Sequence, residues 1–486
     1  MSTTTENGPA FKELGLSERL TQLLISFPSP TPIQSLAIPS ILSSDDDLIL
    51  KSRTGSGKTL AYLIPILQLL DEQVYRKDLQ RSDYGTQVLI ILPTRELAIQ
   101  THTLLESLLR KLTKPHWITN ALLCGGETGR SEEKTRLKRG SVIVCGTPGR
   151  IQEHLEKTQC FKDALKKCRW LVMDEADRLG DAGFKPKVEE INRFLPAGCR
   201  LIFVSATCQS NWLRPQARLI ESAEQSDQLR HFYALLPTKL RIVALLKLLK
   251  DSSFEKSIVF ASCQDVVDYL HEHLRTALKD VIVLKLYGKM DQSERKTTLT
   301  SFKKEPKTCL IATDLAARGL DWPDIDQIIQ LDVPLDPEDY VHRAGRTDRQ
   351  YGKKTTHCRS VLMLMPSEEP ITEFFLKNYN LTLEKLRIDI EEVNVKPNEL
   401  AEKAFRGFLR AYATHGKLLK PICHVKRLHL GQLAASFGLS KAPKIAQAVE
   451  KRKATTDEAR KNISKDRSLP KRKKRLACSE FDAGGV

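Results

Sequence analysis

The sequence predicts an α/β protein built on two doubly wound parallel sheets, followed by a helical extension and a basic tail. The chain has 486 residues, too many for one hydrophobic core and suited to two to four domains of about 100–200 residues each. Short apolar, β-branched runs alternate with amphipathic helical stretches. Strands that are apolar along their whole length are typical of parallel sheets covered on both faces, and such sheets place ligand sites at the carboxyl ends of their strands.

Eleven apolar runs are predicted to be strands. They span residues 48–51, 88–92, 119–123, 142–145, 170–173, 201–204, 257–260, 281–285, 308–312, 327–331 and 360–364. The polar stretch 209–227 interrupts this alternation and indicates a linker between two sheets. After Pro366 the strand pattern fades, and residues 400–438 have the periodicity of helices.

The composition excludes several classes of protein. Hydrophobic residues make up 41% of the chain, which is enough for real cores, so a wholly disordered chain is excluded. No stretch reaches the roughly 18 uncharged apolar residues that a membrane helix needs, and no secretory signal is expected from the first residues. Eleven cysteines occur singly, without a CxxC pair, which favours buried thiols in a reducing compartment.

The net charge of +17 is concentrated at the end of the chain. Residues 441–486 contain fourteen Lys or Arg and six Asp or Glu, a net charge of +8. Large apolar side chains are few there, so we expect a solvated, disordered tail. The run 470–475 has the composition of a nuclear localisation signal or of a phosphate-binding patch. Nucleic acid is the obvious partner for this charge, although charge alone does not establish it.

A glycine-rich loop follows the first predicted strand. It reads Ser52-Arg53-Thr54-Gly55-Ser56-Gly57-Lys58-Thr59 and leads into a helical run. Strand, loop and helix in this order are the context of a P-loop, in which glycines let backbone amides surround phosphate oxygens at a helix N-terminus. Lys58 is then predicted to meet the β- and γ-phosphates, and the Thr59 hydroxyl to be a ligand of Mg²⁺. A glycine turn without a ligand is the alternative, which this context disfavours.

Acidic residues follow the predicted strand 170–173. The run is Asp174-Glu175-Ala176-Asp177. Asp174 is placed to hold Mg²⁺ through water, and Glu175 to orient or deprotonate an attacking water. Alone, such acids would be no more than favourable charges at a helix start. After a P-loop and a strand, the catalytic interpretation is favoured.

These runs resemble motifs of the DEAD-box RNA helicases. Further motifs of that family follow in the family's order, so that the resemblance covers residues 11–365. Phe11 and the run 27–34 resemble the adenine-reading Q motif, which implies that Phe11 stacks on the adenine of ATP and Gln34 pairs with its edge. The resemblance also implies ATP binding by the loop 52–59 and by Asp321. Arg346 and Arg349, three residues apart on one helical face, would reach the γ-phosphate as arginine fingers.

The resemblance implies RNA-binding roles for twelve residues. They are Pro93, Thr94, Arg95, Gly125, Gly126, Thr147, Pro148, Gly149 and Arg150 in the first domain, and Arg295, Thr313 and Asp314 in the second. Ser205 and Thr207 would couple hydrolysis to strand separation. His342 would join Asp174 or Thr207 in a network across the cleft between the domains.

The family fold implies two tandem RecA-like domains. We expect the first at residues 1–210, a linker at 211–230, the second at 231–390, a helical C-terminal extension at 391–440 and the disordered tail at 441–486. The extension resembles that of the nucleolar DEAD-box proteins of large-subunit ribosome assembly, most of all the Dbp-seven type. This implies an RNA-stimulated ATPase, using ATP and Mg²⁺, that unwinds short pre-rRNA duplexes. It also implies pre-ribosomal proteins as partners, a monomer, no membrane, and the nucleus and nucleolus as location.

Three departures from the family pattern leave an alternative open. Asp348 stands beside the arginines with which it would pair, and the loop 350–359 is long and polar. Only twenty residues separate Thr207 from Gln228, where the family has a helix and a strand, so the first sheet is expected to lack an element and to be unstable. The alternative is an RNA-binding assembly scaffold or clamp with impaired turnover. A DNA helicase of the same superfamily is disfavoured by Phe11, Gln34 and the acidic run.

Overall fold

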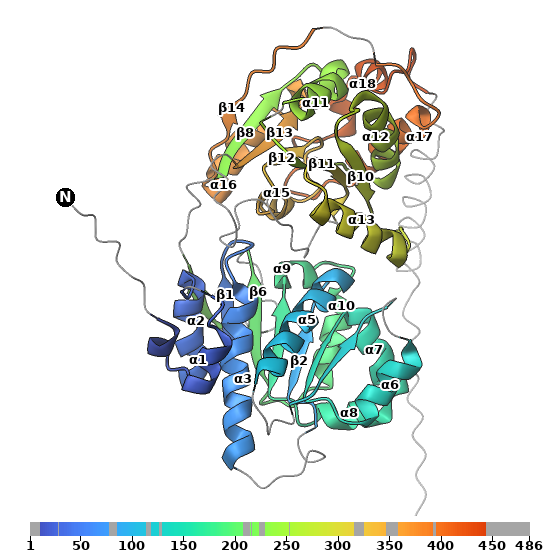
Figure 1. Cartoon of the computed structure of the whole chain (residues 1–486). Helices are drawn as coiled ribbons and strands as arrows, with labels where there is room; N and C mark the ends of the chain where they lie inside the picture. The colour runs from blue at the N-terminus through green and yellow to red at the C-terminus, as the bar shows by residue number, and fades with distance from the viewer. Residues whose placement is uncertain are drawn as a thin grey trace, which may run out of the picture. The chain divides into compact units, whose positions relative to one another are not determined.

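A computed structural model shows two seven-stranded sheets within residues 1–441 (Figure 1). It describes residues 10–27, 29–76, 85–112, 118–125, 129–207, 214, 216–222, 229–251, 253–314, 325–346, 358–391 and 395–443. Over these ranges no helix combines the length and apolar character needed to span a membrane. The basic tail beyond residue 443, including the run 470–475, lies outside the described residues.

The first sheet has the strand order β3-β4-β2-β5-β6-β1-β7, and every pair in it is parallel. Its strands are β1 (Leu48–Lys51), β2 (Val88–Ile91), β3 (Asn120–Leu123), β4 (Ile143–Gly146), β5 (Trp170–Asp174), β6 (Arg200–Ser205) and β7 (Arg218–Glu221). All six strands predicted in the first half of the chain are confirmed. Strands β2, β4, β5 and β6 are buried along their whole length, as expected for a sheet covered on both faces.

Helices cover both faces of this sheet. One face packs against η1 (Phe11–Leu14), α1 (Glu18–Leu23), α2 (Pro32–Ser43), α3 (Lys58–Arg76) and α5 (Arg95–Lys111). The other face packs against α6 (Arg130–Lys138), α7 (Pro148–Lys157), α8 (Gln159–Leu165), α9 (Ala176–Leu179) and α10 (Lys185–Arg193). The carboxyl ends of the strands are thereby left as the edge at which loops converge.

Strand β7 corrects the expectation that the first sheet lacks an element. It lies inside the range 211–230 that we predicted to be a linker, and it pairs with β1 from Leu48↔Arg218 to Lys51↔Glu221. Only Ile220 of its four residues is buried, and the Leu219 side chain is 45% exposed. An edge strand with so few buried side chains has no apolar pattern to reveal it. The instability that we expected from a missing strand therefore has no basis.

The second sheet has the order β10-β11-β9-β12-β13-β8-β14. Its strands are β8 (Leu229–Leu235), β9 (Lys256–Phe260), β10 (Ile282–Leu286), β11 (Thr308–Ala312), β12 (Gln327–Gln330), β13 (Cys358–Leu364) and β14 (Glu384–Lys385). The five strands predicted in the second half are confirmed. Strand β8 was not predicted, because one residue of its seven is buried. It begins at Leu229, inside the range predicted to be a linker.

Two groups of helices accompany the second sheet. Side chains of α11 (Arg241–Leu249), α12 (Gln264–Ala277), α15 (Pro337–Ala344) and α16 (Ile371–Tyr379) lie in the larger core, and Phe302 of α13 (Gln292–Lys304) lies in the smaller core. Two short 3-10 helices, η2 (Thr238–Leu240) and η3 (Pro366–Glu368), precede α11 and α16. Helix α15 follows β12, carries His342, and ends two residues before Arg346.

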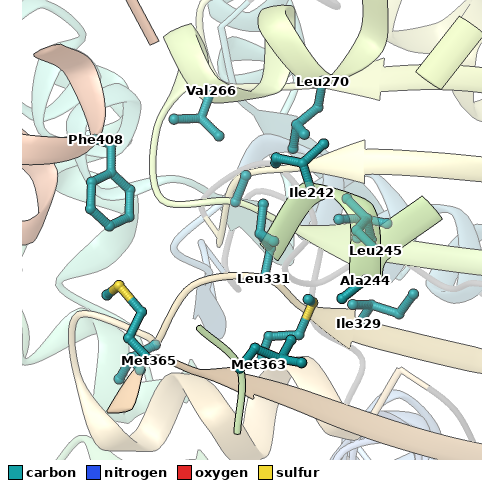
Figure 2. Packing of buried hydrophobic residues seen from close by; sticks show 14 of the residues in the cluster. Ile242, Ala244, Leu245, Val266, Leu270, Ile329, Leu331, Met363, Met365 and Phe408 are labelled. Carbon is teal, nitrogen blue, oxygen red and sulfur yellow. The ribbon is translucent and has the colours of Figure 1, made fainter. Parts of the chain in front are cut away.

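The C-terminal extension shares the core of the second sheet. It consists of α17 (Ala401–Tyr412), η4 (Val425–Arg427) and α18 (Leu430–Ser436). Phe408 of α17 belongs to the same buried cluster as Val266 and Leu270 of α12 (Figure 2). Gly407 lets α17 approach α12 closely, since a Cβ there would lie 2.7 Å from Asp265 Oδ2. The extension is thus an integral part of the fold of residues 1–441.

Candidate functional site

The loop between β1 and α3 has the backbone of a phosphate-binding loop. Gly55 and Gly57 have φ values of 81° and 86°, in the left-handed region that favours glycine. A Cβ on Gly57 would collide with the side-chain nitrogen of Gln34. The hydroxyls of Ser52 and Ser56 are buried without a hydrogen-bond partner among the described residues. Such orphaned donors in a glycine-lined loop fit the phosphates of a nucleotide.

Lys58 is held inside this loop. Its Nζ donates hydrogen bonds to the carbonyls of Ser52 at 2.6 Å and Arg53 at 2.5 Å. Burial lowers the pKa of Lys58 to about 8, against the opposing effect of the nearby carboxylates of the acidic run. The neighbouring Thr59 is the second residue of α3 and is partly buried.

The acidic run begins at the carboxyl end of β5. Asp174 Oδ2 accepts a hydrogen bond from the Tyr62 hydroxyl at 3.1 Å, and Asp174 Oδ1 accepts one from the Glu175 amide at 3.0 Å. Burial and the neighbouring Glu175 raise the pKa of Asp174 to about 6, while Lys58 opposes them. A cation beside Asp174 would favour its ionised form, so the site fits Mg²⁺.

Glu175 has a strained backbone and an unsatisfied carboxylate. Its φ of 49° and ψ of 51° lie in the left-handed region, which residues other than glycine rarely adopt. Its Oε2 is buried and has no hydrogen-bond partner among the described residues. Both features are more common at functional sites than elsewhere in a fold.

A buried ion pair joins the acidic run to α15 of the second sheet. His342 Nε2 lies 2.6 Å from Asp177 Oδ2, and the Thr207 hydroxyl donates to the same oxygen at 3.3 Å. Burial alone would lower the pKa of His342 and raise that of Asp177. Their mutual attraction outweighs burial, so the pKa of His342 is raised and that of Asp177 is lowered. This network differs from the predicted one, because His342 pairs with Asp177 and reaches Thr207 through it.

Arg346 lies beyond the end of α15 and is 3% exposed. Its Nε donates to the His342 carbonyl at 3.0 Å. Burial lowers its pKa, and the charge of Glu175 opposes that effect, so Arg346 lies within electrostatic range of Glu175. The Thr54 hydroxyl donates to the Gly345 carbonyl at 2.8 Å, so the glycine-rich loop touches the residue before Arg346. Arg349, Asp348 and Asp321 lie outside the described residues.

The two predicted adenine-binding residues are buried beside the glycine-rich loop. Gln34 is fully buried; its Nε2 donates to the Gly57 carbonyl at 3.1 Å and its Oε1 accepts from the Thr31 amide at 3.0 Å. Phe11 is 7% exposed and belongs to the core of the first sheet. The described contacts of Gln34 therefore brace the loop itself.

The residues predicted to bind RNA in the first domain follow three neighbouring strands. Pro93, Thr94 and Arg95 come after β2, Gly125 after β3, and Thr147, Pro148, Gly149 and Arg150 after β4. Parallel strands bring these positions to one edge of the sheet. The Thr94 hydroxyl also caps α5 by accepting from the Leu97 amide, and Arg95 lies against Gly125. Gly126 lies outside the described residues.

Three charged residues predicted to bind RNA form ion pairs within the protein. Arg150 pairs with Glu133 at 2.6 Å and Glu153 at 2.8 Å. Asp314 makes two contacts with Arg343, at 2.5 and 2.8 Å.

The third, Arg295 of α13, pairs with Glu96 of α5 at 2.6 Å. Its side chain is 6% exposed and that of Glu96 is 9% exposed. This pair therefore joins the two sheets at a second place, apart from α15. Thr313, between β11 and Asp314, is partly buried.

Known protein families match three parts of the chain. The DEAD/DEAH box helicase profile matches residues 31–214, and the helicase conserved C-terminal domain matches residues 240–350. The profile described as ATP-dependent rRNA helicase SPB4-like, C-terminal extension, matches residues 394–445. The matched ranges include β1 to β6 of the first sheet, β9 to β12 of the second sheet, and the helices of the extension.

Curated relatives match most of the chain. The ATP-dependent RNA helicase dbp7 of Schizosaccharomyces pombe is 31% identical, over 90% of this chain and 75% of its own length. The DEAD-box ATP-dependent RNA helicase 51 of Arabidopsis thaliana is 35% identical, over 90% and 78%. The human protein named ATP-dependent DNA helicase DDX31 is 30% identical, over 98% of this chain but 66% of its own length.

Solved structures have the same architecture. The DEAD-box helicase Mss116 bound to ssRNA and UDP-BeF superposes with a TM-score of 0.77 at 25% identity, covering 88% of this chain and 90% of that one. Dbp5 of S. cerevisiae, bound to RNA and ADP BeF3, gives a TM-score of 0.66 at 23% identity, over 78% of this chain and 96% of that one. The likeness to Dbp5 shows the fold alone.

Proposed function

This chain belongs to the DEAD/DEAH box helicase family, and on that premise we propose that it is an RNA-stimulated ATPase that remodels short pre-rRNA duplexes during assembly of the large ribosomal subunit. One observation carries the proposal. Asp177 of the acidic run in the first domain and His342 of α15 in the second domain meet in a buried ion pair. A site completed by two domains supports hydrolysis that depends on their closure.

Each residue of the site has a chemical role in this proposal. Thr59 and Asp174 would hold Mg²⁺, whose chemistry is to neutralise charge on the phosphate oxygens. Lys58, now bonded to loop carbonyls, would turn to the β- and γ-phosphates of ATP. Glu175, with its free Oε2, would orient the attacking water and accept its proton. Arg346, and Arg349 with it, would stabilise the charge that develops on the phosphoryl group.

RNA would bind at the carboxyl edges of the two sheets. The residues after β2 and β4 lie at the starts of α5 and α7, and helix N-termini suit phosphate oxygens. Contacts to phosphates do not read the base sequence, whereas contacts to 2′-hydroxyls select RNA over DNA. Arg150, Arg295 and Asp314 would then act mainly by holding the protein surface in shape, since each has a partner within the protein.

The C-terminal extension supports the proposed role of this protein in ribosome assembly. Its profile is that of an rRNA helicase, and a relative that aligns with 90% of this chain is named dbp7. We therefore propose pre-rRNA and pre-ribosomal proteins as partners, a monomer as the active form, and the nucleolus as its location. We also propose two changes to the expected domain limits, with β7 (Arg218–Glu221) assigned to the first domain and the second domain beginning with β8 at Leu229.

Steady-state hydrolysis by the full chain tests this function. We expect ATP turnover to rise with single-stranded RNA and to stay basal with DNA of the same sequence. Glu175→Gln should lower turnover by about 100-fold or more, since it removes the general base. Glu189→Gln, an exposed glutamate on α10, is the matched control and should leave turnover unchanged.

The same assay separates the alternatives. Equal turnover with RNA, DNA and no nucleic acid would contradict RNA dependence, and stimulation by DNA alone would favour a DNA helicase. Normal RNA and nucleotide binding, with slow turnover that Glu175→Gln leaves unchanged, would favour the scaffold or clamp.

A further inference from the structure

The segment 331–336 joins β12 to α15, and its first part is fixed within the second domain. Asp332 is 4% exposed, pairs with Arg241, and accepts from the Ser262 amide at 2.7 Å through Oδ2. The Asp332 carbonyl accepts from Arg343 Nη1 at 2.7 Å. At the other end, Asp336 is the N-cap residue of α15, yet its side chain makes no capping hydrogen bond. The start of α15 is therefore weakly held by its own cap.

The C-terminal extension contacts this weakly capped end. The Gly416 amide donates to the Leu335 carbonyl at 3.0 Å. A Cβ on Gly416 would collide with Asp336 Oδ1. Gly416 does not have a positive φ, and the atom that an added Cβ would meet is the end of the exposed Asp336 side chain, which can turn aside. The contact that Gly416 itself contributes to the start of α15 is therefore the hydrogen bond of its amide to Leu335.

The turn that contains Gly416 is held by contacts of the two residues His415 and Tyr412, which precede Gly416. His415 is 5% exposed, and its Nδ1 donates to the Tyr412 carbonyl at 2.7 Å. The Tyr412 and His415 rings meet edge to face with centroids 4.7 Å apart. The Tyr412 hydroxyl donates to Glu368 Oε1 at 2.9 Å, and Glu368 Oε2 accepts from the Met365 amide at 2.8 Å. The turn is thus tied to the end of β13.

The position of helix α15 determines where residues at the proposed ATP site lie. It has eight residues, and His342 follows Asp336 by six, which is about 9 Å along a helix. Its end carries His342, which pairs with Asp177, and leads to Arg346. A displacement of about 1 Å at a reacting group costs on the order of 100-fold in rate. A contact that holds the start of so short a helix would therefore affect the rate of ATP hydrolysis.

We propose that His415 and Gly416 of the C-terminal extension are positioning residues for α15, which set where His342 and Arg346 lie at the ATP site. The extension would then be part of the ATPase as well as a cover for the second sheet. This inference rests on the proposed ATPase function, and it concerns residues that touch neither ATP nor RNA.

The test uses Gly416→Pro in the full chain, since proline lacks the amide that donates to the Leu335 carbonyl. We expect turnover at saturating ATP and RNA to fall about tenfold or more, with the KM for ATP changed by less than twofold. Amide hydrogen exchange in residues 337–346 should become faster, while exchange in β9 and β11 should stay as in the wild type because the second domain still folds. Gly416→Ala keeps the amide, and the exposed Asp336 side chain can turn away from the new methyl group, so Gly416→Ala should keep wild-type turnover and exchange.

A matched control lies in the same extension. At Gly431 of α18 the nearest atom to an added Cβ is His429 Cε1 at 3.4 Å, an ordinary contact, so Gly431→Ala should behave as the wild type. Wild-type turnover and exchange in Gly416→Pro would overturn the proposal, and so would an equal loss of both in Gly416→Ala. A wild-type chain without RNA-stimulated hydrolysis would contradict the proposed function instead, while exchange in α15 would still report on its positioning.

Discussion

His342 and Asp177 lie 165 positions apart in the sequence and 2.6 Å apart in the structure. Their side chains are 2% and 0% exposed. A histidine so deeply buried would ordinarily be neutral, yet the carboxylate raises its pKa. The contact between the two sheets at this place is therefore a charged pair with little solvent to weaken it.

This pair predicts a pH dependence of turnover. The charged pair needs a protonated His342, whose pKa lies above its ordinary 6.5, and an ionised Asp177, whose pKa lies below its ordinary 3.8. Its stabilisation is complete between those two ordinary values, and it is lost as the pH rises through the raised pKa of His342. RNA-stimulated turnover should thus fall on the alkaline side.

His342→Gln should remove that alkaline limb. The variant keeps a hydrogen-bond donor but no charge, so we expect kcat to fall by about tenfold to 100-fold and to lose this part of the pH profile. His271→Gln, at a histidine of α12 beside the exposed Glu272, is the control and should keep the wild-type profile. An unchanged alkaline limb in His342→Gln would assign the titration to another group.

The buried pair of Arg295 and Glu96 predicts an energetic coupling between α13 and α5. Removing one partner leaves the other charge buried and unpaired at a cost of about 3–5 kcal/mol, whereas removing both avoids that cost. Glu96→Gln and Arg295→Met should each lower RNA-stimulated turnover strongly. The double variant should be less impaired than the product of the two single effects.

An exposed pair provides the comparison for this cycle. Arg275 and Glu272 of α12 are 67% and 47% exposed, so the corresponding variants should change turnover little and additively. Additive effects at Arg295 and Glu96 would mean that the two residues act separately, as RNA contacts would.

Gly407 predicts a stability effect in the extension. Alanine in a helix interior normally stabilises by about 1 kcal/mol over glycine. At Gly407, however, the new Cβ would lie 2.7 Å from Asp265 Oδ2, 2.8 Å from Asp265 Cβ and 3.0 Å from Cys263 Sγ. Overpacking of this kind costs about 1–3 kcal/mol, so it outweighs the helix preference.

Denaturant unfolding measures this effect. Gly407→Ala should lower the unfolding midpoint, while Gly431→Ala, in the open position on α18, should leave it unchanged or raise it. A midpoint for Gly407→Ala at or above the wild-type value would show that α12 and α17 separate easily.

The sequence predicted most of the strands, but it did not predict every residue of the candidate site. The strands 88–92, 170–173 and 308–312 were found because all their residues are buried and all but Thr308 are apolar. Strands β7 and β8 were missed because few of their side chains are buried, so no pattern marks them. Asp177 was not proposed as a site residue, although it stands in the same acidic run as Asp174 and Glu175.

The sequence by itself determined the α/β class, most strands, the glycine-rich loop and the acidic run, because each is a local pattern of neighbouring residues. Only the tertiary structure decided that His342 pairs with Asp177, that Arg295 pairs with Glu96, and that Gly416 lies against Asp336. Those partners are far apart in the chain and share no periodic signal. Their choice depends on how parallel strands bring distant loops to one edge, which is a property of the packed sheets.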